Sequence, residues 1–157
     1  MGKLVKVAYI IHVTGESKFR DFERLEKLQS DHYLTKKWIG KEWGEVLSKV
    51  ELVISRAGIN TLSELAILAK PALVIPIPYL YQNEQNRNAK YFEELGLVKI
   101  LPQSKLSGVS LLKNIRFMLN DLNHLKEKAK AVKKVIIPDA ARRLSLEVVL
   151  LGEKIRG

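Results

Sequence analysis

Short apolar runs alternate with longer amphipathic stretches along the chain. The apolar runs cover residues 5–13, 52–54, 72–77 and 97–101. Continuous runs of this length, bounded by glycine, proline or polar turns, are typical of strands that are buried on both faces. Between them the apolar residues recur three or four positions apart, which is the helical period. Strands alternating with helices predict an α/β fold with a parallel, doubly wound sheet and right-handed crossovers.

The helical stretches follow the apolar runs in order. We expect helices over about 16–29, around 43–47, and over 60–69, 84–95, 107–119, 121–135 and 139–153. Residues 31–40 are ambiguous and fit a short strand with a loop. Thr61 and Glu64 have the spacing of a capping box, with Asn60 as an alternative cap. Proline ends or separates helices, so Pro71 bounds one helix and Pro138 separates the last two.

Composition narrows the class of protein. The 157 residues fit a single domain, 1–157, with a sizeable core, and 46% are hydrophobic while 28% are charged. The absence of cysteine excludes disulfides, a thiolate nucleophile and a cysteine metal site, and suits a reducing cytoplasm. No apolar run is long enough to span a membrane, and the N-terminal run lacks the cleavage site of a signal peptide.

The chain is basic, with a formal net charge of +10. Such a surface favours polyanions. The densest cluster comprises Lys126, Lys128, Lys130, Lys133 and Lys134 on one expected helix. This cluster is either a solvated helix face or a surface for an anionic membrane or partner. Nucleic acid is disfavoured because no aromatic-rich basic motif accompanies the charge.

Polar residues gather where the strand around 52–54 leads into the next helix. Gly58, Asn60 and Thr61 suit a phosphate at a helix N-terminus, or alternatively a tight turn and a cap. Glu64 could accept hydrogen bonds from a ribose diol, or instead complete the capping box. Arg56 could equally pair with phosphate or brace a loop.

Two further groups carry candidate chemistry. Gln85 and Asn88 share a helix face, and their amides suit sugar hydroxyls or simply a polar first turn. His12, Thr14 and Gly15 lie at the end of the first strand, where a hydroxyl and a backbone N–H could contact a pyrophosphate. His12 could instead be a partly buried histidine held by a backbone carbonyl. The three histidines lack the spacing of metal ligands, and no Ser-His-Asp order stands out.

Taken together, these residues resemble the C-terminal, donor-binding half of MurG-like UDP-GlcNAc glycosyltransferases, the glycosyltransferase family 28 C-terminal domain. The likeness covers about residues 5–150 and is specific as an ordered set. The matching pieces are His12-x-Thr14-Gly15, Leu52–Gly58, Thr61-x-Ser63-Glu64, Pro71-Ala72-Leu73-x-x-Pro76, Gln85-x-x-Asn88-Ala89, Leu101-Pro102-Gln103 and Pro138–Ala141.

The resemblance implies a Rossmann-like domain that forms one half of a GT-B fold, and it implies roles for the candidate residues. Glu64 would bind the ribose hydroxyls, and the Gly58–Thr61 turn with Thr14 would hold the diphosphate of UDP-GlcNAc. Gln85 and Asn88 would hold the GlcNAc hydroxyls, and backbone near Ile39 and Gly40 would contact the uracil. The chemistry implied is an inverting displacement on a lipid-linked acceptor, as in lipid II synthesis for peptidoglycan, with no obligatory metal or other cofactor.

The resemblance also implies what must come from elsewhere. We expect the family's N-terminal acceptor domain, with its general base, and the first strand of the donor domain to be missing, which leaves no catalytic residue in this chain. The acceptor half would be a separate domain or subunit, and the protein would lie on the cytoplasmic face of the membrane. The open sheet edge could also form a homo-oligomer. The alternatives are a non-catalytic assembly module, a UDP-GlcNAc 2-epimerase or a glycolipid glycosyltransferase.

Overall fold

The computed structural model describes residues 2–16, 18–136 and 139–156. Five short strands are present in this part of the chain, and every neighbouring pair of them runs parallel. The strands are β1 (Ile10–Val13), β2 (Tyr33–Lys36), β3 (Val53–Ser55), β4 (Ala72–Val74) and β5 (Val98–Ile100). Helices connect successive strands, so the predicted α/β class is confirmed.

The helices follow the predicted order, and those after residue 80 have nearly the predicted bounds. They are α1 (Asp21–Glu26), α2 (Trp43–Lys49), α3 (Ile59–Ile67), α4 (Glu84–Glu94), α5 (Gly108–Asn120), α6 (Leu122–Val135) and α7 (Ala140–Arg156), with 3-10 turns η1 (Tyr81–Asn83) and η2 (Gln103–Lys105). The end of α4 is a helix stop built on Gly96, whose φ of +87° favours glycine. Pro138, which we expected to separate the last two helices, lies outside the described residues.

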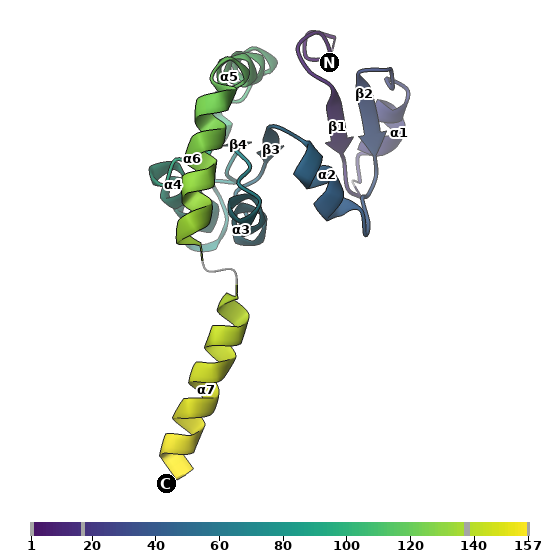
Figure 1. Ribbon diagram of the computed structural model, residues 1–157. Helices are drawn as coiled ribbons and strands as arrows, with labels where there is room; N and C mark the ends of the chain where they lie inside the picture. The colour runs from purple at the N-terminus through teal and green to yellow at the C-terminus, as the bar shows by residue number, and fades with distance from the viewer. Residues whose placement is uncertain (1, 17, 137–138, 157) are drawn as a thin grey trace.

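The strands form two sheets instead of the single sheet that we expected. One sheet pairs β1 with β2 (Figure 1), and the other has the order β3-β4-β5. A doubly wound sheet of order 3-2-1-4-5-6 separates into these same two groups when its central strand is left out. The division therefore agrees with a Rossmann-like order, and it places the edges of β1 and β3 on either side of the break.

Both faces of the three-stranded sheet are covered. Ala72 and Val74 of β4 belong to a core cluster with α3, α4 and α6, which includes Leu62, Leu65, Phe92 and Val132. The alternate residues Leu73 and Ile75 belong to a second cluster, with Leu101, Ile115 and Met118. Since successive side chains of a strand point to opposite faces, the sheet is packed on both sides, as a doubly wound fold requires.

The N-terminal part departs most from the predicted elements. Residues 2–7 form turns, in which Val7 N–H and Ala8 N–H donate to the Leu4 carbonyl, so the strand begins only at Ile10. Leu4 packs against the second core cluster, so this part of the apolar run contributes to the core instead of pairing with another strand. The helix expected over 16–29 shortens to α1, because Arg20 before it adopts a left-handed conformation with φ of 53°.

Helix α7 extends away from the other helices in Figure 1, and its large apolar side chains are exposed. They are Leu144, Leu146, Val148, Val149, Leu150 and Leu151. Among the described residues, no helix combines the length and the apolar character that crossing a bilayer would require.

Candidate functional site

The N-terminus of α3 is open. The helix begins at Ile59 with Gly58 as its N-cap, and no side chain caps it. Its first helical bond runs from Leu62 N–H to the Gly58 carbonyl, so the N–H groups of Ile59, Asn60 and Thr61 precede the ladder. The predicted capping box with Thr61 or Asn60 as the cap is therefore wrong. Free N–H groups and the positive end of the helix dipole make this turn suitable for a phosphate.

Glu64 points to α2 instead of to the start of its own helix. Its Oε2 accepts a hydrogen bond from the Trp43 indole Nε1–H at 3.3 Å, and the carboxylate remains exposed. The backbone N–H of Trp43 donates to the Gly40 carbonyl at 3.0 Å. The structure thus connects two predicted contacts, Glu64 and the Ile39–Gly40 loop, through one residue that we did not predict.

Gln85 and Asn88 of α4 hold the turn between β3 and α3. Gln85 Oε1 accepts from Ala57 N–H at 3.3 Å and from Ile77 N–H at 3.0 Å. Asn88 Nδ2 donates to the Ala57 carbonyl at 3.3 Å. These bonds use one end of each amide, which leaves the Gln85 Nε2 donors and the Asn88 Oδ1 acceptor for a ligand. Both side chains therefore have a structural role beside the predicted binding role.

Arg56 links the end of β3 to two neighbouring segments. Its Nη1 donates to the Ile75 carbonyl at 3.0 Å and to Gln103 Oε1 at 2.6 Å. These bonds tie the end of β3 to the segments that follow β4 and β5. Of the two alternatives for Arg56, the structure therefore favours the loop brace.

Thr14 and Gly15 do not join this group. Their backbone N–H groups donate to the carbonyls of Lys36 and Lys37 at 3.0 and 3.1 Å, which continues the pairing of β1 with β2. The Thr14 hydroxyl donates to the Gly15 carbonyl at 3.1 Å. The N–H groups of Thr14 and Gly15 therefore already have acceptors within the protein, which leaves neither of them for the expected contact with a pyrophosphate.

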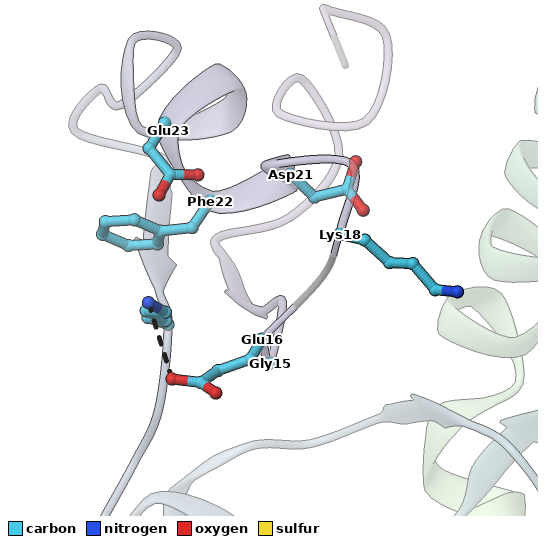
Figure 2. A pocket seen from close by; sticks show the side chains of 7 residues that line it. Gly15, Glu16, Lys18, Asp21, Phe22 and Glu23 are labelled. Carbon is cyan, nitrogen blue, oxygen red and sulfur yellow. Dashed lines mark ion pairs between the residues drawn. The ribbon is translucent and has the colours of Figure 1, made fainter.

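Gly15 instead borders a polar hollow of about 340 Å³ at the carboxyl end of β1 and β2. Figure 2 shows its lining, which comes from the loop after β1, from α1 and, with Lys37, from the segment after β2. An ion pair of 3.6 Å joins Glu16 to Lys37 across it. Both carboxylates and ammonium groups line this hollow, so it has no single charge preference. Its lining comprises Gly15, Glu16, Lys18, Asp21, Phe22, Glu23 and Lys37.

A second hollow of about 420 Å³ lies beside Asn88, between the start of α3 and α4. Its lining is aromatic and polar and comprises Ile59, Tyr81, Gln82, Glu84, Arg87, Asn88, Tyr91 and Phe92. We did not predict Tyr81, Arg87 or Tyr91. The spacing of Glu84, Arg87, Asn88 and Tyr91 would have indicated Arg87 and Tyr91, because residues three or four apart share a helix face.

His12 is half-buried in the two-stranded sheet, where its Nδ1 lies 2.9 Å from the Tyr33 hydroxyl. Burial lowers the pKa of His12 below 6.5, and the Asp21 carboxylate opposes part of that shift. The unfolded chain then binds more protons than the folded protein just below pH 6.5. His12 therefore stabilises the fold fully above pH 6.5, and this contribution is lost as the pH falls towards the lowered pKa.

We expect the unfolding free energy to decrease as the pH falls below 6.5, and a His12→Gln variant to show a flatter profile over the same window. The difference should stay below about 1 kcal/mol, because a half-exposed side chain keeps much of its hydration. Urea unfolding between pH 5.5 and 7.5 measures it. Parallel profiles for the two proteins would contradict the expectation.

No group of three or more His, Asp or Glu side chains in the described part of the chain is arranged to hold a metal ion. In the lysine cluster of α6, Lys126 pairs with Glu51 at 2.6 Å and Lys130 with Glu127 at 2.7 Å. These exposed pairs show that the acidic residues nearby neutralise part of the cluster.

Comparison with known proteins identifies the family. The model of the glycosyltransferase family 28 C-terminal domain matches residues 2–144. Among curated relatives, the "UDP-N-acetylglucosamine--N-acetylmuramyl-(pentapeptide) pyrophosphoryl-undecaprenol N-acetylglucosamine transferase" of Bacillus cytotoxicus is 38% identical over 137 residues, which are 86% of this chain and 37% of the relative. The protein of the same name from Gloeothece citriformis is 37% identical over 142 residues, 90% of this chain and 38% of the relative.

Solved structures support the fold. MurG of Acinetobacter baumannii superposes with a TM-score of 0.74 at 24% identity, over 90% of this chain and 42% of that one. CalG4, a calicheamicin glycosyltransferase, superposes with a TM-score of 0.71 at 18% identity, over 92% of this chain and 36% of that one. This chain spans less than two fifths of the length of the curated relatives that it matches. Its sequence and fold together show that it belongs to the glycosyltransferase family 28 C-terminal domain family.

Proposed function

We propose that this chain is the donor-binding part of an N-acetylglucosaminyltransferase that transfers GlcNAc from UDP-GlcNAc to a lipid-linked acceptor. The observation that carries the proposal is the open N-terminus of α3, whose preceding turn is held by the two amides of α4, with the exposed Glu64 carboxylate further along the same helix. N–H donors for a phosphate, a carboxylate acceptor for a diol and amides for sugar hydroxyls thus lie on α3 and α4. The names of the curated relatives, which are UDP-N-acetylglucosamine transferases acting on a pyrophosphoryl-undecaprenol, support this donor and this class of acceptor.

The proposed binding mode follows from these groups. The diphosphate lies at the N–H groups of residues 59–61, and Glu64 accepts hydrogen bonds from the ribose hydroxyls. Gln85 Nε2 and Asn88 Oδ1 face the GlcNAc hydroxyls, and the uracil lies at the backbone of Ile39 and Gly40. Thr14 and Gly15 belong to the mode only through side-chain or carbonyl atoms, because their N–H groups are used within the sheet.

In the proposed reaction an acceptor hydroxyl attacks the anomeric carbon of GlcNAc while the bond from that carbon to the UDP oxygen breaks. The hydroxyl proton passes to a base outside this chain, in the acceptor domain or subunit. Negative charge grows on the leaving diphosphate, and the dipole and N–H groups of α3 stabilise it. This scheme uses no divalent metal and no other cofactor.

The basic surface of the protein agrees with an acceptor that lies in a membrane. A lipid-linked acceptor places the reaction at a membrane face, and we propose the cytoplasmic face, where the basic α6 would approach anionic lipid. The net charge of +10 supports such an approach. The bare sheet edges favour a second candidate function, a non-catalytic assembly module that pairs with another chain or with a second copy.

Calorimetric titration with UDP-GlcNAc tests the proposal. We expect saturable binding, and we expect Glu64→Ala to weaken it about 10- to 100-fold, because the variant loses hydrogen bonds to a charged acceptor. Glu153→Ala removes the same charge from the exposed surface of α7 and serves as the matched control. Titrations with UDP-glucose and with UMP serve as comparisons. UDP-glucose reports the contribution of the N-acetyl group, and UMP reports the joint contribution of the sugar and the second phosphate.

Equal affinities for the wild type and Glu64→Ala would refute the binding mode. The absence of any binding at millimolar UDP-GlcNAc would refute the donor-site proposal for this chain by itself and favour the assembly module. Mass measurement in solution, alone and with a candidate acceptor half, then distinguishes a monomer, a dimer and a heteromeric complex.

A further inference from the structure

We propose that Trp43 is a positioning residue: it orients the Glu64 carboxylate for a ligand diol and couples that carboxylate to the Ile39–Gly40 loop. The inference rests on the proposed function and adds to it a residue that the sequence pattern did not indicate.

The first step is the anchoring of the indole ring. Trp43 is half-buried and packs against the core cluster that contains Leu47 and Leu62. It is also the first residue of α2, so its backbone is fixed by the helix. A side chain held by packing and by a helix start keeps one orientation, which makes its N–H a fixed donor.

The second step is the hydrogen bond to Glu64. The indole N–H is a donor only, so Glu64 Oε2, 3.3 Å away, must accept. Glu64 is exposed, and an exposed glutamate otherwise samples several rotamers whose freedom a ligand must remove on binding. With one oxygen held, Oε1 and the remaining lone pair of Oε2 keep a defined direction for two neighbouring hydroxyls.

The backbone of Trp43 holds the neighbouring loop. Trp43 N–H donates to the Gly40 carbonyl at 3.0 Å, which closes the turn that leads into α2. The Ile39–Gly40 loop, proposed to contact the uracil, and Glu64, proposed to accept from the diol, are therefore both held by Trp43. A ligand that contacts both gains from the order that Trp43 imposes before binding.

The decisive variant is Trp43→Phe, which keeps an aromatic ring against the core and removes the N–H donor together with the second ring of the indole. We expect UDP to bind about three- to tenfold more weakly, the usual effect of one hydrogen bond. 2′,3′-dideoxy-UDP has no diol, so we expect its affinity to be the same for wild type and variant. In a Glu64→Ala background, Trp43→Phe should cause no further loss for UDP.

Trp38→Phe is the matched control, since it makes the same chemical change at a residue that is 77% exposed. We expect it to leave the difference between UDP and dideoxy-UDP unchanged. Equal losses for both nucleotides in Trp43→Phe would mean that Trp43 acts only through packing, and would overturn the inference. An unchanged affinity for UDP would overturn it as well.

A measurement without ligand separates this inference from the proposed function. The chain has two tryptophans, so a ¹H–¹⁵N spectrum contains two indole signals. We expect Glu64→Ala to shift the Trp43 signal and to leave the Trp38 signal in place. A shifted signal in a protein that binds no UDP would refute the donor-site proposal but retain the pairing. An unshifted signal would refute the pairing of Trp43 with Glu64, whatever the protein binds.

Discussion

Replacing Gln85 with alanine should destabilise the protein by about 2–4 kcal/mol and abolish measurable binding of UDP-GlcNAc. Gln85 Oε1 accepts two backbone N–H groups, from Ala57 and Ile77, and the first of these residues is fully buried. A buried N–H group that loses its acceptor costs about 1–3 kcal/mol. The two N–H groups lie on the segments that follow β3 and β4. Without Gln85 the protein is therefore less stable, and the turn before α3, where the ligand is proposed to bind, is no longer held in place.

Gln85→Glu separates the structural role from the binding role. Glutamate keeps an acceptor oxygen at the same place, so we expect the unfolding free energy to remain within about 1 kcal/mol of the wild type. It lacks the amide N–H donors and adds negative charge near the proposed diphosphate, so ligand affinity should still fall. Urea unfolding and calorimetry on both variants measure the two effects. A Gln85→Ala protein as stable as the wild type would contradict this account.

Leu65→Ala should cost about 3 kcal/mol of unfolding free energy. Leu65 has no exposed surface and lies in the core cluster that joins α3 to β4, α4 and α6. Truncating a buried leucine removes transfer free energy and leaves a cavity, at a total cost of about 2–5 kcal/mol. For a chain of this length the melting temperature should fall by about 6–12 °C.

Leu146→Ala is the control for this truncation, because Leu146 of α7 is 53% exposed. We expect a change within about 0.5 kcal/mol, as for most surface substitutions. Thermal unfolding of both variants, followed by circular dichroism, gives the comparison. A loss at Leu146 as large as that at Leu65 would show that α7 packs against other parts of the protein in solution.

The order of strands and helices was predictable because it depends on local patterns. Helix α4 carries its buried residues, Ala89 and Phe92, at helical spacing, and Gly96 marks its end. The apolar run of β4 has no alternation, since both of its faces are buried. Strand β1 was predicted too long, because an apolar run does not reveal that Leu4 packs in the second core cluster.

The contacts of the candidate site were less predictable, because they join residues far apart in the sequence. Glu64 pairs with Trp43, 21 positions away, whereas the local pattern with Thr61 indicated a capping box. Gln85 accepts from Ala57 over 28 positions. The residue types at α3 and α4 were thus identifiable, but a pattern of neighbours cannot state which oxygen of a side chain is already in use.

The division of the strands into two sheets has a consequence for how the protein opens to solvent. A two-stranded sheet is marginally stable in water by itself, and α1 beside β2 has no buried residue among those described. The three-stranded sheet is covered on both faces. Local opening follows such differences in burial, so backbone amides of β1 and β2 exchange with solvent through smaller fluctuations than those of β4. The Ile39–Gly40 loop, which we propose to contact the uracil, follows β2. A ligand that contacts both this loop and α3 would therefore also slow amide exchange in the sheet of β1 and β2.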